Sequence, residues 1–228
     1  MPKTQKAYKG LAMEGAIATW YSKNTGKDPS RFLEVARMLG ERIAPPARVL
    51  EVAPGPGYLA VELARRGFRV AALDISKSFV RIVGENARKA GVEIDVRLGD
   101  AAAMPFEDAQ VDYVVCMAAF KNFTNPLGAI DEMHRVLAPG GEASIYDLRK
   151  DAAPADIEAE VRKMQLSAFN AFMTRFTFKH MLLKKAYTIE GIEELAQQSR
   201  FGSGATSRRF GASDVSKIGI GFELRLRK

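Results

Sequence analysis

The sequence predicts an α/β fold in which a mainly parallel β-sheet carries helices on both faces. Three observations indicate this class. Short β-type runs alternate with helical patterns between Arg48 and Leu148, and strand–helix–strand units of this length build parallel sheets. The run Val111–Met117 is apolar except for one residue, which is typical of a strand buried on both faces. The chain has 228 residues, 47% of them hydrophobic, so one domain with a sizeable core is expected.

Each element of this alternation has its own local signal. Ser76 is a good N-cap for a helix that runs through Ala90, and Gly91 follows as a stop. Pro139, Gly140 and Gly141 form a turn after another helical segment. The other helices are expected over Gly57–Arg66 and Pro126–Leu137, and the strands over Arg48–Ala53, Arg69–Ile75, Glu93–Leu98, Val111–Met117 and Glu142–Leu148.

The C-terminal part of the chain behaves differently. The segments Gly204–Phe210 and Ile218–Arg227 both look extended, with no helix between them. Only antiparallel strands can be joined by so short a connection. Apolar and charged residues alternate over 222–227, which predicts an edge strand with one face in water. We therefore expect seven strands, mainly parallel, with an antiparallel last strand.

Two segments stand outside the alternation. Residues 1–45 are expected to form a helical cap of one or two helices, interrupted around Gly26. Residues 152–186 are expected to form a helical insertion rich in Phe and Met after the fifth strand. The predicted organisation is thus an N-terminal cap, 1–45, followed by one main domain, 46–228.

Composition excludes several classes of protein. The net charge of +7 is concentrated at the two ends. There is no run of five or six like charges and no basic stripe with interleaved aromatics, so a solvated surface is favoured over nucleic-acid binding. The single cysteine excludes a disulfide framework and a Cys-rich zinc site. No metal site is expected. A polar N-terminus and the lack of a long apolar run predict a cytoplasmic protein without a membrane span.

A glycine turn after the first strand is the most informative motif. Gly55 and Gly57 lie where that strand enters a helix, so the backbone can approach a ligand closely and the N–H groups of the helix start can face it. Asp74 ends the second strand and Asp100 ends the third. In a right-handed β-α-β unit both carboxylates lie at the edge of the sheet that carries the turn, where Asp74 can accept hydrogen bonds from ribose hydroxyls.

The turn also satisfies the dinucleotide pattern, because Ala60 follows Gly57 at the required spacing. Two features argue against a pyrophosphate ligand. Pro54 and Pro56 remove two backbone donors from the loop. Glu51 adds a negative charge inside the first strand, at a position from which it can reach an ammonium group or the turn. An adenosine ligand without phosphate is favoured.

With these motifs the sequence resembles the class I S-adenosylmethionine-dependent methyltransferases, in the small-molecule branch that includes the ubiquinone-biosynthesis enzymes. The resemblance covers residues 46–150 strongly and 188–228 in architecture only, and it implies a Rossmann-like fold. Glu51-x-Ala53-x-Gly55-x-Gly57 matches the family's acidic glycine turn, except that Ala53 replaces the first glycine. That departure is mild if Ala53 keeps a negative φ.

The resemblance also implies contacts to the cofactor, S-adenosyl-L-methionine, and to its product S-adenosyl-L-homocysteine. The ribose and adenine segments are matched by Asp74-Ile75-Ser76 and Gly99-Asp100-Ala101, and the exit of the fourth strand lines the methionine end. Tyr21 in the cap is expected to close over the cofactor. The predicted cofactor-binding residues are Tyr21, Glu51, Ala53, Gly55, Gly57, Asp74, Ile75, Asp100, Ala101, Cys116 and Met117.

The implied reaction is in-line transfer of the sulfonium methyl group to a small, apolar or aromatic organic acceptor. The protein then supplies proximity and alignment, and a general base is needed only for an acceptor that holds its proton at neutral pH. Three alternatives stay open: an RNA methyltransferase, an NAD(P)-dependent oxidoreductase, and a cofactor-binding protein without catalysis. The sequence leaves open whether the protein is a monomer or a homodimer.

Several residues are candidates for contact with the acceptor. Asp147 and His180 are candidate catalytic groups that could orient or deprotonate it. Phe172 and Phe176 lie on one face of a helix in the insertion, and we expect this segment to form a lid. Lys121 is expected to be solvated. The predicted substrate-binding residues are Asn122, Tyr146, Phe172 and Phe176.

Overall fold

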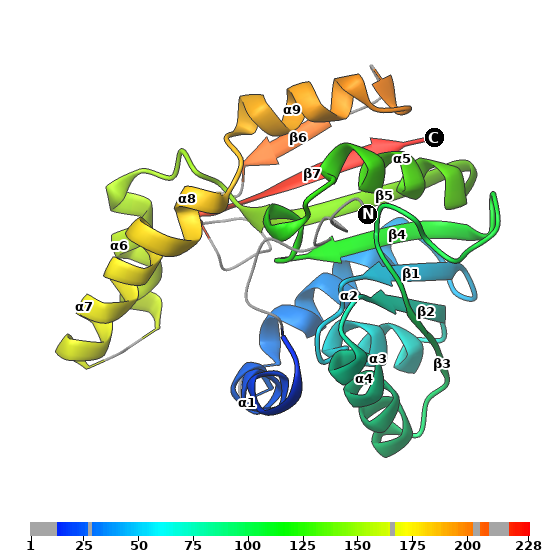
Figure 1. Ribbon diagram of the computed structural model, residues 1–228, viewed down its shortest axis with the longest axis horizontal. Coiled ribbons are helices and arrows are strands. Elements are labelled where there is room, and N and C mark those ends of the chain that lie inside the picture. The colour runs from blue at the N-terminus through cyan, green and yellow to red at the C-terminus, as the bar shows by residue number, and fades with distance from the viewer. Residues whose placement is uncertain (1–12, 27–28, 165–166, 203–205, 210–218) are drawn as a thin grey trace, which may run out of the picture.

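The structure is a computed structural model that describes residues 13–26, 29–164, 167–202, 206–209 and 219–228. These residues form a three-layer arrangement in which one twisted sheet lies between two layers of helices (Figure 1). The predictions for residues 1–12 and for the connection at 210–218 lie outside the described part of the chain.

The described strands form one sheet in the order β3-β2-β1-β4-β5-β7-β6. The pairs among β1 to β5 are parallel, and β7 is antiparallel to both of its neighbours, β5 and β6. The predicted α/β fold with a mainly parallel sheet and an antiparallel last strand is confirmed. The strands are β1 (Arg48–Val52), β2 (Arg69–Asp74), β3 (Ile94–Leu98), β4 (Val111–Met117), β5 (Leu137–Leu148), β6 (Thr206–Arg209) and β7 (Gly221–Arg227).

Helices cover the two faces of the sheet with separate apolar clusters. One face packs against α2 (Ser30–Arg42), α3 (Tyr58–Arg65) and α4 (Lys77–Ala90), and the other packs against α5 (Pro126–Val136) and α9 (Ile189–Gln198). The central strand β4 contributes to both clusters, since Tyr113 and Val115 face one layer while Val114 and Cys116 face the other. Burial on both faces explains its nearly continuous apolar sequence.

Local capping sets the start of α4 at the carboxyl end of β2. The Ser76 hydroxyl accepts a hydrogen bond from the Phe79 N–H at 3.1 Å, and Gly91 ends the helix with a φ of +68°. Both roles match the sequence prediction and follow from the ordinary preferences of serine at N-caps and glycine at left-handed C-caps.

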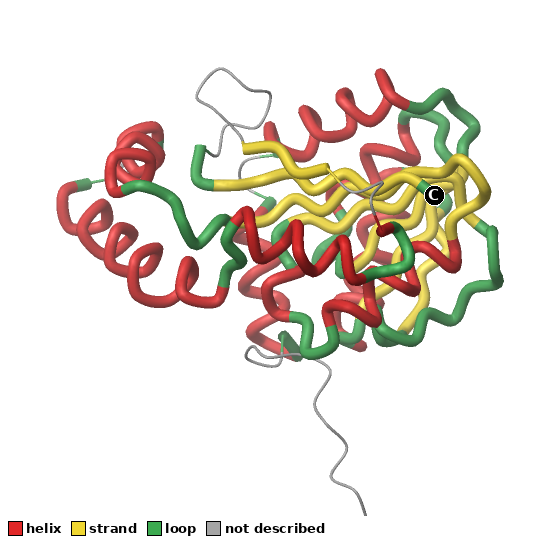
Figure 2. Tube along the Cα trace, turned by 90° about the horizontal axis from the view of Figure 1, so that it is seen from above, coloured by secondary structure: helices red, strands yellow, loops and turns green. Residues whose placement is uncertain are grey.

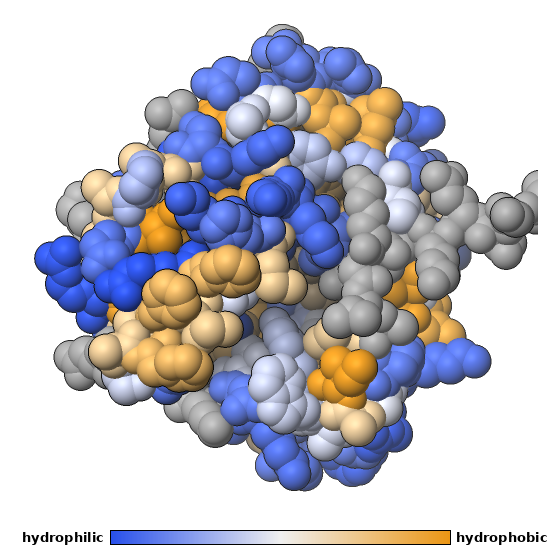
Figure 3. Space-filling model, turned by 60° about the vertical axis from the view of Figure 1, so that its left-hand side comes forward, coloured by the Kyte–Doolittle hydropathy of each residue, from blue (hydrophilic) through white to orange (hydrophobic). Residues whose placement is uncertain are grey.

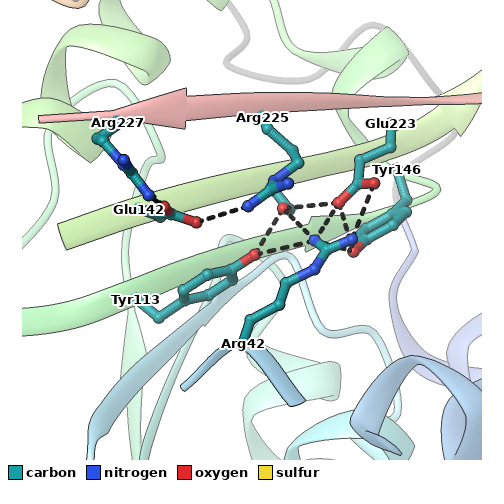
Figure 4. A network of polar contacts seen from close by, with 8 residues as sticks. Arg42, Tyr113, Glu142, Tyr146, Glu223, Arg225 and Arg227 are labelled. Carbon is teal, nitrogen blue, oxygen red and sulfur yellow. Dashed lines mark hydrogen bonds and ion pairs between the residues drawn. The ribbon is translucent and has the colours of Figure 1, made fainter. Parts of the chain in front are cut away.

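The last strand corrects one expectation. β7 is not an edge strand with a wet face, because it lies between β5 and β6. Its charged residue Glu223 is completely buried. Arg42, at the end of α2, forms an ion pair with Glu223, and the hydroxyls of Ser144 and Tyr146 donate to the same carboxylate at 3.0 and 2.8 Å (Figure 4). The alternation therefore places a buried polar network, rather than water, against this face.

Two groups of helices flank the edge at which the parallel strands end (Figures 1 and 2). The helix α1 (Gly15–Thr25) lies on one side. On the other, α6 (Pro154–Lys163), α7 (Ala168–Thr177), a π-helical turn η2 (Phe178–Leu182) and α8 (Leu183–Lys185) project as an arm. A short 3-10 turn, η1 (Phe120–Asn122), follows β4. In the described part of the chain no helix is both long and apolar enough to cross a bilayer.

Candidate functional site

The glycine turn lies between the end of β1 and the start of α3. Gly55 and Gly57 both have left-handed backbones, with φ of +56° and +75°. A Cβ added to Gly57 would lie 2.8 Å from a methyl group of Val83 on α4, so any larger residue here would push α3 and α4 apart. Gly57 is the N-cap of α3, and the free N–H groups of this helix start point toward the carboxyl edge of the sheet.

Ala53 contradicts the expectation that the residue replacing the first glycine keeps a negative φ. Its φ is +55°, which costs an L-residue with a Cβ roughly 1–2 kcal/mol. The Ala53 N–H donates to the carbonyl of Leu73 at 2.8 Å. The strand β1 consequently ends one residue earlier than expected, and the chain turns sharply into the glycine segment.

Asp74 couples the turn to the next strand. One carboxylate oxygen accepts the N–H of Gly55 at 3.2 Å and the other accepts the N–H of Ser76 at 2.9 Å. Asp74 is buried, and burial raises its pKa to about 6 despite these hydrogen bonds. The carboxylate thus lies beside the turn, as predicted from the chain topology.

Glu51 is the second buried acid at this edge. Its side chain is 3% exposed, and its Oε2 atom has no hydrogen-bond partner among the described residues. Burial raises its pKa to about 8, and a backbone hydrogen bond from Ala60 only partly offsets that effect. A buried carboxyl oxygen without a hydrogen bond destabilises the fold unless a ligand supplies a hydrogen-bond donor.

The helix α1 covers the glycine turn. A Cβ on Gly55 would lie 3.8 Å from the ring of Tyr21, so the structure brings Tyr21 to the predicted site. Tyr21 also meets Phe79 edge-on, with ring centroids 6.0 Å apart. Sequence reasoning missed how α1 is anchored: the Glu14 carboxylate accepts the N–H groups of Lys77 and Ser78 at 2.9 and 3.0 Å.

The remaining residues of the predicted nucleoside region lie after β2 and β3. Ile75 is 44% exposed directly after Asp74, which leaves an apolar surface beside the turn. Asp100 is half-buried and accepts the N–H of Ala102 at 2.9 Å. Ala101 packs against the main core cluster. The structure thus brings Ile75, Asp100 and Ala101 to the same edge as Asp74, since β1, β2 and β3 are parallel neighbours.

The exit of β4 provides the next part of this edge. Cys116 is completely buried, and burial raises the pKa of its thiol well above the usual value, so it is a neutral packing group. Met117 is half-buried, and Ala118 follows with a φ of +59°. A second strained alanine at the end of a neighbouring strand is noteworthy, because such backbone strain concentrates at functional sites.

Lys121 is not solvated, contrary to the prediction. Its side chain is 8% exposed, and its Nζ atom lies 2.7 Å from Oδ1 of Asp147. The backbone N–H of Lys121 donates to the other oxygen of Asp147 at 2.9 Å, and Nζ also donates to the carbonyl of Ala118 at 2.7 Å. Asp147 therefore uses both oxygens to hold the turn after β4 against the end of β5.

Tyr146 does not present its hydroxyl at the carboxyl edge. The hydroxyl donates to Glu223 and accepts from Arg42 at 3.2 Å, and the ring belongs to the cluster that packs under α2 and α3. The structure therefore assigns this hydroxyl to the buried network, and the contact of Tyr146 with a substrate stays a prediction. In the alternation of β5, even-numbered residues face this layer, which the sequence alone did not reveal.

The other predicted substrate residues are divided between η1 and the arm. Asn122 is half-buried at the end of η1. Phe172 and Phe176 lie on α7 and are 62% and 49% exposed. The ring of His180, in the π-helical turn, lies 4.6 Å from the ring of Phe176. Figure 3 views this side and shows hydrophobic and strongly hydrophilic side chains next to each other.

A wide cavity of about 800 Å³ lies at the opposite edge of the sheet. It is lined by residues at the amino ends of the strands, such as Arg48, Arg69 and Val111, and by none of the predicted site residues. In open parallel sheets ligands bind outside the carboxyl ends of the strands, so we place the candidate site there.

Comparison with known proteins identifies the same part of the chain. Residues 50–145 match a family model described as a methyltransferase domain. This range contains the glycine turn, Asp74, Asp100 and the exit of β4, and it ends before the arm.

Two curated relatives illustrate the similarity in sequence. The chain is 31% identical to a ubiquinone/menaquinone biosynthesis C-methyltransferase of Cupriavidus pinatubonensis, over 72% of this chain and 70% of that protein. It is 36% identical to a demethylmenaquinone methyltransferase of Thermus thermophilus, over 45% of this chain and 47% of that protein. The chain thus spans about half the length of several curated relatives that it matches.

A solved structure extends the similarity of fold to the whole chain. The crystal structure of a putative S-adenosyl-L-methionine-dependent methyltransferase from Methanococcus maripaludis superposes with a TM-score of 0.72 and 20% identity. The superposition covers 100% of this chain and 97% of that one.

Proposed function

Because this chain belongs to the class I S-adenosylmethionine-dependent methyltransferases, in the branch of the ubiquinone/menaquinone-biosynthesis enzymes, we propose that it transfers a methyl group from S-adenosylmethionine to a small quinone-type acceptor. The observation that supports this most strongly is the convergence of Glu51, Asp74 and the glycine turn at one edge of the sheet. The nature of the acceptor is supported by the relatives, one of which is a demethylmenaquinone methyltransferase.

The residues at this edge fit such a cofactor. The unpartnered Oε2 of Glu51 suits a cationic donor, such as the ammonium of the methionine moiety. The carboxylate of Asp74 suits ribose hydroxyls, and the exposed side chain of Ile75 suits the adenine face. Tyr21 would cover the bound molecule from α1, and the exit of β4 would line its methionine end.

When bound, S-adenosylmethionine supplies an electrophilic sulfonium methyl group. The chain itself contributes binding, alignment and exclusion of water. The ion pair between Lys121 and Asp147 fixes the turn after β4, so we assign Asp147 a positioning role toward the acceptor rather than proton transfer. His180, exposed beside Phe176, is the group we propose as a base for an acceptor that must lose a proton.

The helical segments on both sides of the edge complete the proposal. The helix α1 acts as a cap over the cofactor, supported by its hydrogen bonds to the start of α4. The arm acts as a lid for the acceptor, supported by the exposed rings of Phe172 and Phe176. Asn122 orients the acceptor from η1, the turn that follows β4.

A direct assay tests the proposed reaction. The protein is incubated with methyl-tritiated S-adenosylmethionine and either a demethylated naphthoquinol or a demethylated ubiquinol precursor. We expect tritium to be transferred to one of the two quinols, in an amount proportional to the enzyme concentration. Binding of S-adenosylhomocysteine without transfer to either quinol would refute the quinone-type acceptor.

The protonation state of Glu51 predicts a pH-dependent affinity. With a pKa of about 8, Glu51 is mostly protonated at neutral pH in the free protein. An ammonium group favours the carboxylate, so binding of S-adenosylhomocysteine should release up to one proton, and the affinity should rise as the pH increases toward 8. Calorimetry at pH 7 in buffers of different ionisation enthalpy measures this release. The Glu51→Gln variant should lose both effects, and an unchanged proton release in it would contradict the assignment.

The lid predicts a selective effect on the acceptor. Replacing Phe172 and Phe176 by Ala removes apolar surface that is already exposed, so folding should change little. Loss of their contact should raise the acceptor KM by about tenfold, while the Kd for S-adenosylhomocysteine stays within about twofold. Leu33→Ala, at a similarly exposed site on α2, is the control. A change in cofactor affinity with an unchanged KM would discredit the lid.

A further inference from the structure

The arm, defined as residues 154–164 and 167–185, exposes an unusual amount of apolar surface. Six of its large apolar side chains are between 41% and 72% exposed: Met164, Phe169, Phe172, Met173, Phe176 and Met181. In α7 the only buried residue is Ala171. Contiguous patches of this kind on a protein surface mark sites of interaction.

The same surface is positively charged. The segment 164–185 contains four basic residues and no acidic residue. Lys179, Lys184 and Lys185 are all exposed. The fourth, Arg175, forms an ion pair with Glu158 at 2.6 Å, which fastens α7 to α6. The lysines therefore lie in the part of the arm that follows the apolar helix.

A pocket of about 300 Å³ at the base of the arm gathers part of this charge. Lys150, Lys179 and Lys184 line it together with apolar side chains that include Ile157 and Leu183. Among the described residues no carboxylate forms an ion pair with these three lysines. The acids nearest in sequence to Lys150 are already engaged. Asp147 pairs with Lys121, and Asp151 and Asp156 both pair with Arg149. The pocket is thus suited to a singly or doubly charged anionic headgroup.

We propose that the arm docks on the surface of an anionic phospholipid bilayer, with the Phe and Met side chains in the interface and a lipid phosphate in the lysine pocket. Helices that lie in a membrane interface combine apolar aromatic residues with Lys and Arg, and they bind anionic lipid through both. The arm carries both features on one projecting element. A second copy of the chain does not fit as occupant, because pairing two arms would bring like charges together at the lysines.

This surface goes beyond methyl transfer and does not depend on it. If both hold, an apolar acceptor dissolved in the bilayer would reach the carboxyl edge of the sheet directly from the arm. The lipid-binding test is therefore made without turnover, and binding of S-adenosylhomocysteine is measured in parallel as a report on the cofactor site.

Co-sedimentation with vesicles tests the proposal. The full chain is mixed with vesicles of phosphatidylcholine alone or of phosphatidylcholine with phosphatidylglycerol. We expect the anionic vesicles to bind at least tenfold more tightly, and raised salt to weaken the binding. The charge reversals Lys179→Glu and Lys184→Glu together should lower affinity for anionic vesicles by about tenfold or more, and Phe169→Ser should lower it about fivefold.

Matched changes away from the arm are the controls. Lys89→Glu on α4 and Leu33→Ser on α2 are also at exposed sites and should leave vesicle binding unchanged. Circular dichroism verifies that each variant is folded. Failure of the wild-type chain to bind anionic vesicles at physiological ionic strength would overturn the proposal. An equal loss of vesicle affinity in the control variants would also overturn it. So would complete displacement of the anionic vesicles by inorganic phosphate, because the pocket would then be a site for free anions.

Discussion

Replacing Asp74 by Ala is expected to weaken binding of S-adenosylhomocysteine by roughly two orders of magnitude or more. The variant loses two hydrogen bonds from ribose hydroxyls to a charged acceptor, each contributing roughly 1.5–3 kcal/mol. The same carboxylate also accepts the N–H of Gly55 and of Ser76, so its loss additionally loosens the turn. Isothermal titration of the two proteins with S-adenosylhomocysteine measures the difference.

Two further variants separate binding from general damage. Asp74→Asn keeps an acceptor but loses the charge, so its affinity should lie between those of the wild type and the alanine variant. Asp108→Ala removes a carboxylate whose side chain is 81% exposed, and it should leave the affinity unchanged. Thermal unfolding checks that each variant is folded. An affinity in Asp74→Ala close to that of the wild type would contradict the proposed ribose contact.

The Arg42→Met variant is expected to lose about 3–5 kcal/mol of unfolding free energy, because it leaves Glu223 as an uncompensated charge at a fully buried position. In the wild type, burial alone would raise the pKa of Glu223, but the ion pair with Arg42 and the hydroxyl donors outweigh it and lower the pKa. Urea-induced unfolding followed by circular dichroism gives the difference in free energy.

The pH dependence of this loss has a definite sign. In the wild type the lowered pKa of Glu223 stabilises the fold above the unfolded-state value near 4.3, and this is lost as the pH falls through the folded-state value. Without Arg42 we expect a raised pKa for Glu223. Below about pH 4 its carboxyl group is then neutral, so the variant no longer carries a buried unpaired charge and its unfolding free energy approaches that of the wild type. The difference between the two proteins should therefore be smaller in acid than at pH 7.

Two other variants provide controls for the buried pair. Arg37→Met, on the same helix, breaks only a surface ion pair with Glu41 whose side chains are 50% and 63% exposed, and it should cost no more than about 0.5 kcal/mol. The double variant Arg42→Met with Glu223→Met should recover most of the loss, because it removes both charges. If Arg42→Met were as stable as Arg37→Met, the buried network would contribute little to the stability of the fold.

Local sequence patterns predicted the part of the site that depends on chain topology. Gly55, Gly57 and Asp74 could be placed because each lies directly after a strand, and parallel neighbours bring the carboxyl ends of strands to one edge. The cap and stop of α4, at Ser76 and Gly91, were likewise local signals. Tyr21 could be placed near the turn only by supposing that the N-terminal helices close over the cofactor, since nothing in its own segment indicates a ligand.

Partners distant in the chain explain what sequence reasoning missed. Lys121 stands between Phe120 and the polar Asn122. Its partner Asp147 lies 26 residues away, so burial of the lysine was not visible. Glu223 alternates with apolar residues as a wet face would, yet its partner Arg42 lies 181 residues away. The positive φ of Ala53 was missed because alanine seldom adopts that conformation, although the family motif has a glycine at this place.

Titration of the unmodified chain with S-adenosylhomocysteine, and separately with NADH, most directly tests whether the edge formed by Glu51, Asp74 and the glycine turn holds a sulfonium-derived nucleoside. Saturable binding of one S-adenosylhomocysteine per chain, with no heat from NADH beyond dilution, is the predicted outcome. Saturable binding of NADH with no binding of S-adenosylhomocysteine would contradict the account.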